Sequence, residues 1–174
     1  ADAWGEVLSP EQLVGEAHRF RELHGFDAIK LKAGVFPPEQ EIAGLRALRA
    51  AFPNAPLRID PNGGWTVETT LALLPQLDGL IEYLEDPTVG LEGNARVQAA
   101  TGIPLATNMY VVQSSHLPEN MTRDAFRVIL SDHHYWGGLH ASRELARICE
   151  IWGLGLSMHS NSHLGISLAA MTHL

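Results

Sequence analysis

Residues 26–34 of the chain read FDAIKLKAG, a short apolar run that contains two lysines. In an extended strand, side chains two positions apart point to the same face, so Lys30 and Lys32 share one face and Ile29 and Leu31 share the other. An ordinary half-buried strand turns its polar face to water. The alternative is that the lysine face lines a functional site, and the rest of the sequence bears on that choice.

Stretches typical of strands and helices alternate along the rest of the chain. Amphipathic helices are expected between the strands, as in the stretch 37–53, which has apolar residues along one side. Such alternation is typical of parallel βαβ units. The predicted strands cover residues 26–32, 56–60, 80–86, 103–108, 126–132 and 154–160.

The spacing of the strands fits both a doubly wound open sheet and a (β/α)8 barrel. The polar strand ends are separated by 28, 25, 23, 24 and 27 residues, which is one βα unit each. No Gly-x-Gly-x-x-Gly or phosphate-binding loop follows a predicted strand, which weakens a nucleotide-binding open sheet. A complete barrel has eight strands in about 250 residues. With 174 residues, the chain is therefore predicted to be α/β, a partial TIM-type barrel of about six parallel βα units over 1–174.

Composition and charge exclude several classes of function. A hydrophobic fraction of 45% with 18% charged residues is typical of a globular protein. The net charge of −8 argues against a nucleic-acid or anionic-membrane partner, and no apolar run approaches the ~18 residues that span a bilayer. Cys149 is the single cysteine, so neither a disulfide framework nor a cysteine-rich zinc site is expected. No secretory signal is visible, and we expect a cytoplasmic protein.

Polar side chains stand at the end of every predicted strand. In a parallel barrel these ends converge on one mouth, where the active site lies. One polar residue in a loop is common, whereas six consecutive strands ending this way favour a site. In chain order the residues are Lys30 and Lys32, Asp60 with Asn62, Glu85 with Asp86, Asn108, Asp132, and His159 with Asn161.

Asp60, Glu85 and Asn108 end three successive strands and offer only oxygen atoms as ligands. Each alone could serve as a cap or turn residue. As a set they match the preference of Mg²⁺ for carboxylate and carbonyl oxygen. The sequence therefore predicts one magnesium site.

A cation with lysines on one side and His159 on the other suits the removal of a proton next to a carboxylate. The enediolate that results needs neutralisation by the metal and by nearby ammonium groups. A lysine can act as the base if a neighbouring ammonium and the metal lower its pKa, which gives a reason for Lys30 beside Lys32. Asp132 ends the preceding strand and is expected to orient the ring of His159.

The remaining histidines are expected to be structural or exposed. His159 and His163 are four apart in HSNSH, but this stretch lacks the glutamate of a zinc-protease helix, and His159 ends a strand. We therefore expect no zinc site there. The same expectation applies to His133, His134, His140 and His173.

Six stretches together resemble the enolase superfamily and, within it, the glucarate dehydratase family. They are KLKAG, RIDPNGGW, YLEDP, LATNM, ILSDHHYWGG and MHSNSHLGISLAAMTHL, and the resemblance runs from about residue 9 to residue 174. It implies Mg²⁺ bound by the three oxygen donors named above, Lys32 as one acid/base, and His159 with Asp132 as the other. The substrate contacts that it implies are Lys30, Asn62, Asn108, Ser160 and Asn161.

The resemblance also implies a reaction: Mg²⁺-dependent dehydration of a glucarate-like hexarate to a 5-keto-4-deoxy diacid. The substrate would be a small dicarboxylic acid sugar, and a homo-oligomer is left open. The capping domain of that family and its first and last barrel strands have no counterpart in these residues. Two alternatives stay open: a racemase or epimerase of a hydroxy acid using the same residues, and a catalytically inactive fragment.

Overall fold

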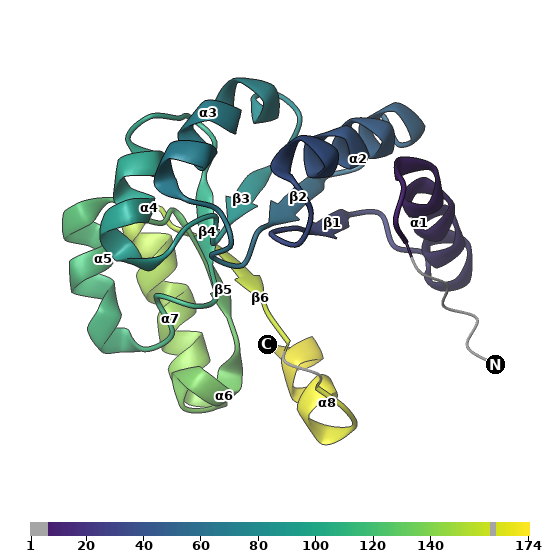
Figure 1. Cartoon of the computed structure of the whole chain (residues 1–174). Coiled ribbons are helices and arrows are strands. Elements are labelled where there is room, and N and C mark those ends of the chain that lie inside the picture. Colours follow the sequence, from purple (N-terminus) through teal and green to yellow (C-terminus); the bar gives the residue numbers. More distant parts are fainter. Residues whose placement is uncertain (1–6, 161–162) are drawn as a thin grey trace.

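The computed structural model describes residues 7–160 and 163–174, which form a parallel sheet with helices between the strands (Figure 1). Within this part of the chain the strands are β1 Ile29–Lys32, β2 Leu57–Asp60, β3 Tyr83–Glu85, β4 Leu105–Thr107, β5 Val128–Ser131 and β6 Gly155–Met158. The helices are α1 Pro10–His24, α2 Pro38–Ala51, α3 Val67–Leu77, α4 Gly90–Gln98, η1 Ser114–His116, α5 Leu117–Arg123, α6 His133–Trp136, α7 Leu139–Trp152 and α8 Ile166–His173.

The strands lie side by side in the order in which they occur in the sequence, β1 to β6, and every neighbouring pair is parallel. The sheet curls into a half-barrel, so the predicted partial TIM-type barrel is confirmed. Because all strands run in one direction, their carboxyl ends lie along the same rim. Each strand is shorter than predicted, as at β3, where the stretch 80–86 contains only three strand residues.

Local sequence signals determine where several helices begin and end. Ser9 caps α1 and forms a reciprocal capping box with Gln12, Pro10 occupies the first helical position, and Gly25 ends the helix at a φ of 71°. The side chain of Thr66 accepts a hydrogen bond from the backbone of Thr69 and caps α3. These caps satisfy backbone groups that the helices leave unpaired.

The core lies between the sheet and the helices that cover its outer face. Outward-pointing residues of β2 to β5 are buried against the apolar sides of the helices, whereas those of the edge strand β1 are only partly buried, and the predicted inward side of α2 is confirmed. The core includes Leu57, Ile59, Leu84, Leu105 and Ile129 from strands and Ile42, Leu45, Leu48 and Phe52 from α2 and the residue that follows it.

The sequence predicts that Leu139, Leu145, Ile148 and Trp152 of α7 face inward and that Cys149 is buried, and the structure differs from this at the two ends of the helix. Leu145 and Cys149 are buried, as expected, but Leu139 and Trp152 are 48% and 45% exposed. They are the first and last residues of the helix, and α7 packs against β6, which lies at the edge of the sheet. The apolar spacing therefore marks the correct side of the helix but overestimates the length that the sheet covers. Burial raises the pKa of the Cys149 thiol to about 11.

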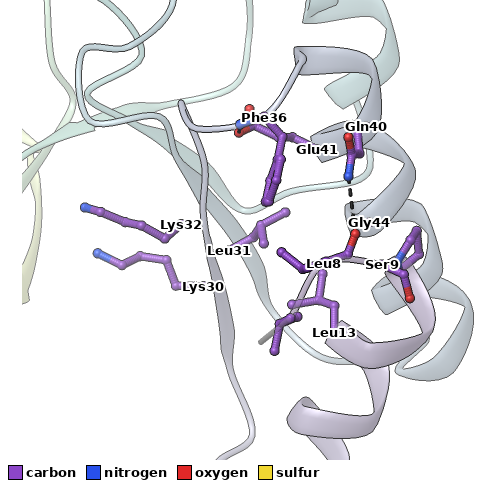
Figure 2. Close-up of a pocket in the computed structure, with 12 residues that line it drawn as sticks. Leu8, Ser9, Leu13, Lys30, Leu31, Lys32, Phe36, Gln40, Glu41 and Gly44 are labelled. Atoms are coloured by element: carbon purple, nitrogen blue, oxygen red, sulfur yellow. Dashed lines mark hydrogen bonds between the residues drawn. The ribbon is translucent and has the colours of Figure 1, made fainter. Parts of the chain in front are cut away.

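The two faces of β1 differ in the way that the alternating sequence predicts. Figure 2 shows Leu31 directed toward a hollow between β1, α1 and α2, which Leu8, Leu13 and Leu31 help to line. Lys30 and Lys32 extend to the opposite side, the concave face of the sheet. None of the helices in the described residues is long and apolar enough to cross a membrane.

Candidate active site

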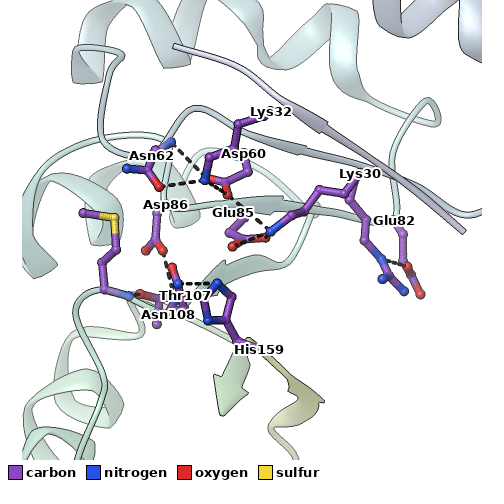
Figure 3. Close-up of polar contacts among 12 residues, drawn as sticks. Lys30, Lys32, Asp60, Asn62, Glu82, Glu85, Asp86, Thr107, Asn108 and His159 are labelled. Atoms are coloured by element: carbon purple, nitrogen blue, oxygen red, sulfur yellow. Dashed lines mark hydrogen bonds and ion pairs between the residues drawn. The ribbon is translucent and has the colours of Figure 1, made fainter. Parts of the chain in front are cut away.

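Lys30 on β1 reaches across the concave face to carboxylates on two other strands (Figure 3). Its Nζ lies 3.0 and 2.9 Å from the two carboxylate oxygens of Glu85 at the end of β3. The same Nζ lies 3.3 Å from Oδ2 of Asp60 at the end of β2. The lysine face of the opening strand therefore forms part of a polar cluster.

Lys32 makes the second set of contacts with this cluster. Its Nζ donates to Asp60 Oδ2 at 2.6 Å and to Asn62 Oδ1 at 2.8 Å. Asn62 adopts the left-handed conformation, with a φ of 55°, and its backbone N–H donates to Asp60 Oδ1 at 2.9 Å. Asparagine tolerates this conformation better than most residues, so the turn after β2 holds Asn62 beside Lys32.

Two carboxylates are buried together at the centre of the cluster. Asp60 is 1% and Glu85 0% exposed. Burial, and then the charge of Asp60, raise the pKa of Glu85 to about 7, although Lys30 acts in the opposite direction. Burial lowers the pKa of Lys30, but the charges of Glu85 and Asp60 outweigh it and raise that pKa overall. Burial therefore disfavours the charged form of Glu85 even with two lysines beside the carboxylates, and a divalent cation at this place would favour that form.

Asn108 supplies a further oxygen on the rim that carries Asp60 and Glu85. It follows β4, and its Nδ2 lies 2.7 Å from His159 Nε2, whereas its Oδ1 is buried without a hydrogen-bond partner among the described residues. A buried amide oxygen without a partner is unfavourable unless a ligand satisfies it. Together with Asp60 and Glu85 it gives the all-oxygen donor set that Mg²⁺ prefers. The residues therefore fit the predicted magnesium ion.

Asp86 positions Asn108, a role that the sequence analysis did not assign. Its Oδ2 accepts the backbone N–H of Asn108 at 3.0 Å. Asp86 is fully buried, and burial raises its pKa to about 6, against the effect of hydrogen bonds from Thr107 and Asn108. The sequence signal for this role is the acidic pair in YLEDP, whose second residue is Asp86.

The expected pairing of Asp132 with His159 is looser than predicted. Asp132 Oδ2 and His159 Nδ1 are 4.0 Å apart, and neither has a hydrogen-bond partner in the described part of the chain. The other oxygen of Asp132 caps α6 by accepting the backbone N–H of His134 at 3.0 Å, and it lies 3.3 Å from His163 Nε2. Asp132 thus faces three histidines instead of one. Burial and then the charge of Lys30 lower the pKa of His159.

The remaining predicted substrate contacts lie beyond β6. The exposed Ser160 accepts the backbone N–H of His163 with its Oγ at 3.1 Å. Asn161 lies outside the described residues. The structure therefore brings together the predicted residues from Lys30 to His159.

A buried glutamate that the sequence analysis missed anchors the loop after Lys32. Oε1 of Glu41 accepts the backbone N–H groups of Val35 and Phe36, each at 3.0 Å, and its Oε2 accepts Trp65 Nε1 at 3.1 Å. At Gly34, with a φ of 81°, an added Cβ would overlap the carbonyl oxygen of Pro61. This loop therefore packs directly on the turn that carries Asn62.

Comparison with known proteins identifies the fold of the chain. The Enolase C-terminal domain-like family matches residues 12–174. A probable glucarate dehydratase from Streptomyces coelicolor is 55% identical over 99% of this chain, which corresponds to 40% of that protein.

Solved structures agree with this result. An enolase from Pseudomonas fluorescens, crystallised with magnesium, potassium and tartrate, is 52% identical, with a TM-score of 0.96 over 99% of this chain and 40% of its own. An enolase from Thermobispora bispora, complexed with magnesium and formate, is 56% identical, with a TM-score of 0.95 over 98% of this chain and 40% of its own. The chain thus spans about two fifths of the length of these relatives.

Proposed function

Because this chain belongs to the Enolase C-terminal domain-like family, we propose that it forms part of an enzyme that dehydrates an acid sugar. The observation that carries the proposal is the cluster of Lys30 and Lys32 with buried Asp60 and Glu85. The similarity to a probable glucarate dehydratase supports a carbon–oxygen lyase with a dicarboxylic acid sugar as its substrate.

Asp60, Glu85 and Asn108 are the residues that would hold Mg²⁺. When bound, the ion supplies positive charge for the substrate carboxylate and for the negative charge that develops as the neighbouring carbon loses its proton. Relatives crystallised with magnesium support this assignment. The buried, unpartnered Oδ1 of Asn108 and the burial of the Asp60 and Glu85 carboxylates also support it.

Lys32 and His159 are proposed to move protons at opposite sides of the substrate. Lys32 lies on the edge strand β1, and His159 directly follows β6 at the other edge. One of them takes the proton from the carbon next to the carboxylate. As the C–O bond at the following carbon breaks, the departing hydroxyl receives a proton from His159 and leaves as water.

Other residues around the cluster are proposed to bind the substrate and orient these groups. Lys30 offers an ammonium to a substrate carboxylate, and Asn62 offers its amide beside Lys32. Asp132 would close the gap of 4.0 Å to orient the ring of His159. Ser160 and Asn161 are the proposed contacts beyond β6. A cytoplasmic location and a homo-oligomeric state stay predictions.

The same two acid/base groups also support a second function. A lysine at one edge of the sheet and a histidine at the other could remove a proton from one face of a hydroxy acid and return it to the other face. That reaction is racemisation or epimerisation, and it needs no leaving group. The two functions differ in their product.

Product analysis separates the alternatives. The protein at its full natural length would be incubated with glucarate and Mg²⁺ and followed by NMR. The proposal predicts a keto-deoxy diacid that forms a semicarbazone, and Lys32→Ala together with His159→Ala should abolish it. A change of configuration without loss of water would show epimerisation and contradict dehydration. Turnover by the double variant at the unmutated rate would contradict both functions.

A further inference from the structure

Three histidines from separate parts of the chain form a cluster beside the candidate active site. His133 and His134 begin α6, and His163 precedes α8, which lies near α6 in Figure 1. The ring centroids of the three pairs are 4.4 to 4.8 Å apart. His133 and His163 are buried, whereas His134 is exposed. The prediction that these histidines are merely structural or exposed does not explain why they face one another.

One nitrogen of each ring points at the hydroxyl of Ser167 in the first turn of α8. The distances from Ser167 Oγ are 3.2 Å to His133 Nε2, 3.0 Å to His134 Nε2 and 2.9 Å to His163 Nδ1. A hydroxyl donates one hydrogen bond and accepts two, so Ser167 can satisfy all three rings only if one of the three nitrogens is unprotonated and the other two carry protons. The three ring nitrogens therefore converge on one atom, the Oγ of Ser167.

The opposite nitrogens of His163 and His134 face a carboxylate. Asp132 Oδ1 lies 3.3 Å from His163 Nε2 and 3.8 Å from His134 Nδ1. Histidines that bind a metal through one nitrogen commonly present the other to a carboxylate, which fixes the tautomer and strengthens the ligand. His133 Nδ1 is buried and has no hydrogen-bond partner among the described residues.

We propose that His133, His134 and His163 form a second cation site, for a divalent metal that prefers imidazole nitrogen, such as Zn²⁺. One ligand atom from each ring already lies within 4.8 Å of the other two. With Zn–N distances of ~2.0–2.1 Å, tetrahedral ligands lie about 3.4 Å apart. The rings need to approach one another by about 1.4 Å, and the exposed ring of His134 has the room to move.

The two sites select different cations. The site around Glu85 offers oxygen, which suits Mg²⁺, whereas the histidine cluster offers neutral imidazole, which suits Zn²⁺ and its neighbours among the transition metals. His133 and His134 also line a surface hollow with Leu164 and Ile166, which gives a cation a path from solvent. Asp132 lies between the two sites, since one of its oxygens faces His163 and the other faces His159.

Zinc titration in excess Mg²⁺ tests this site. The purified protein, stripped of metal with a chelator, would be titrated with Zn²⁺ by calorimetry. One equivalent should bind, and His134→Ala should weaken it by at least about tenfold, because a ligand is lost. The control is His140→Ala, an exposed histidine on α7 outside the cluster, which should bind as the unmutated protein does. Equal binding by His134→Ala and the unmutated protein would overturn the proposal.

Two further variants distinguish the histidine cluster from the carboxylate site. Asp132→Asn keeps all three ligands and should weaken Zn²⁺ by about 10–100-fold through the loss of the orienting carboxylate. Glu85→Gln removes a proposed magnesium ligand and should leave Zn²⁺ binding unchanged. Loss of zinc binding in Glu85→Gln, with a far-ultraviolet circular dichroism spectrum that matches the unmutated protein, would place the ion at the carboxylates and overturn the second site.

Discussion

The two faces of the curled sheet differ in polarity, in charge and in the exposure of their side chains. The outer face carries Leu57, Ile59 and Leu105, which are fully buried beneath the helices. The inner face carries Lys30 and Lys32, with side chains 36% and 59% exposed, over the buried carboxylates of the neighbouring strands.

This difference shows which face stabilises the fold. Burying apolar surface beneath the helices contributes about 25 cal/mol per Å² removed from water. Burying charged groups has the opposite effect, because burial and then the charge of Asp60 raise the pKa of Glu85. The outer face therefore provides the stability that allows the inner face to hold an unfavourable group of charges.

The largest expected effect on stability comes from the outer face. Leu57→Ala removes a fully buried side chain and should lower the free energy of unfolding by about 2–5 kcal/mol, because transfer and cavity terms add. Urea denaturation measures the change. Leu23→Ala on α1, which is 62% exposed, is the matched control and should stay within about 0.5 kcal/mol. A similar loss in both variants would break the distinction between core and surface.

A smaller effect is expected on the inner face. In the absence of metal, Glu85→Gln should either lower the free energy of unfolding by no more than about 1 kcal/mol or raise it. The substitution relieves the burial of a charged carboxylate and its repulsion from Asp60, while Lys30 keeps Asp60 as a partner. Addition of Mg²⁺ should stabilise the unmutated protein but not this variant. A loss as large as that of Leu57→Ala, measured in the same denaturation experiment, would contradict the view that these charges oppose folding.

The sequence predicts which strand residues lie on the inner face of the sheet and which lie on the outer face. Side chains alternate along each strand, so the faces of Lys32 and Leu31 follow from the sequence alone, and parallel strands bring Asp60 to the same rim as Glu85. The resemblance adds the roles of these residues. The order of the strands along the sheet comes from the structure.

Contacts that depend on loops and on helix packing could not be predicted. His163 meets His133 across 30 residues because the start of α8 packs on α6 through side chains such as Ser167, and no spacing in the sequence indicates this. The same packing explains why Asp132 lies closer to His163 than to His159. The burial of Glu41 depends likewise on Trp65, which lies 24 residues away.

The central claim is that the inner face is a site for proton transfer with Lys32 and His159 at opposite edges. Deuterium incorporation from heavy water, followed by NMR in the protein at its full natural length with epimeric hexarates, tests it most directly. Lys32→Ala should lose exchange by about 10²–10⁴-fold for one configuration at the carbon next to the carboxylate, and His159→Ala for the other. Exchange of both epimers by Lys32→Ala at the unmutated rate would contradict the claim and return the two lysines to the surface of an ordinary strand.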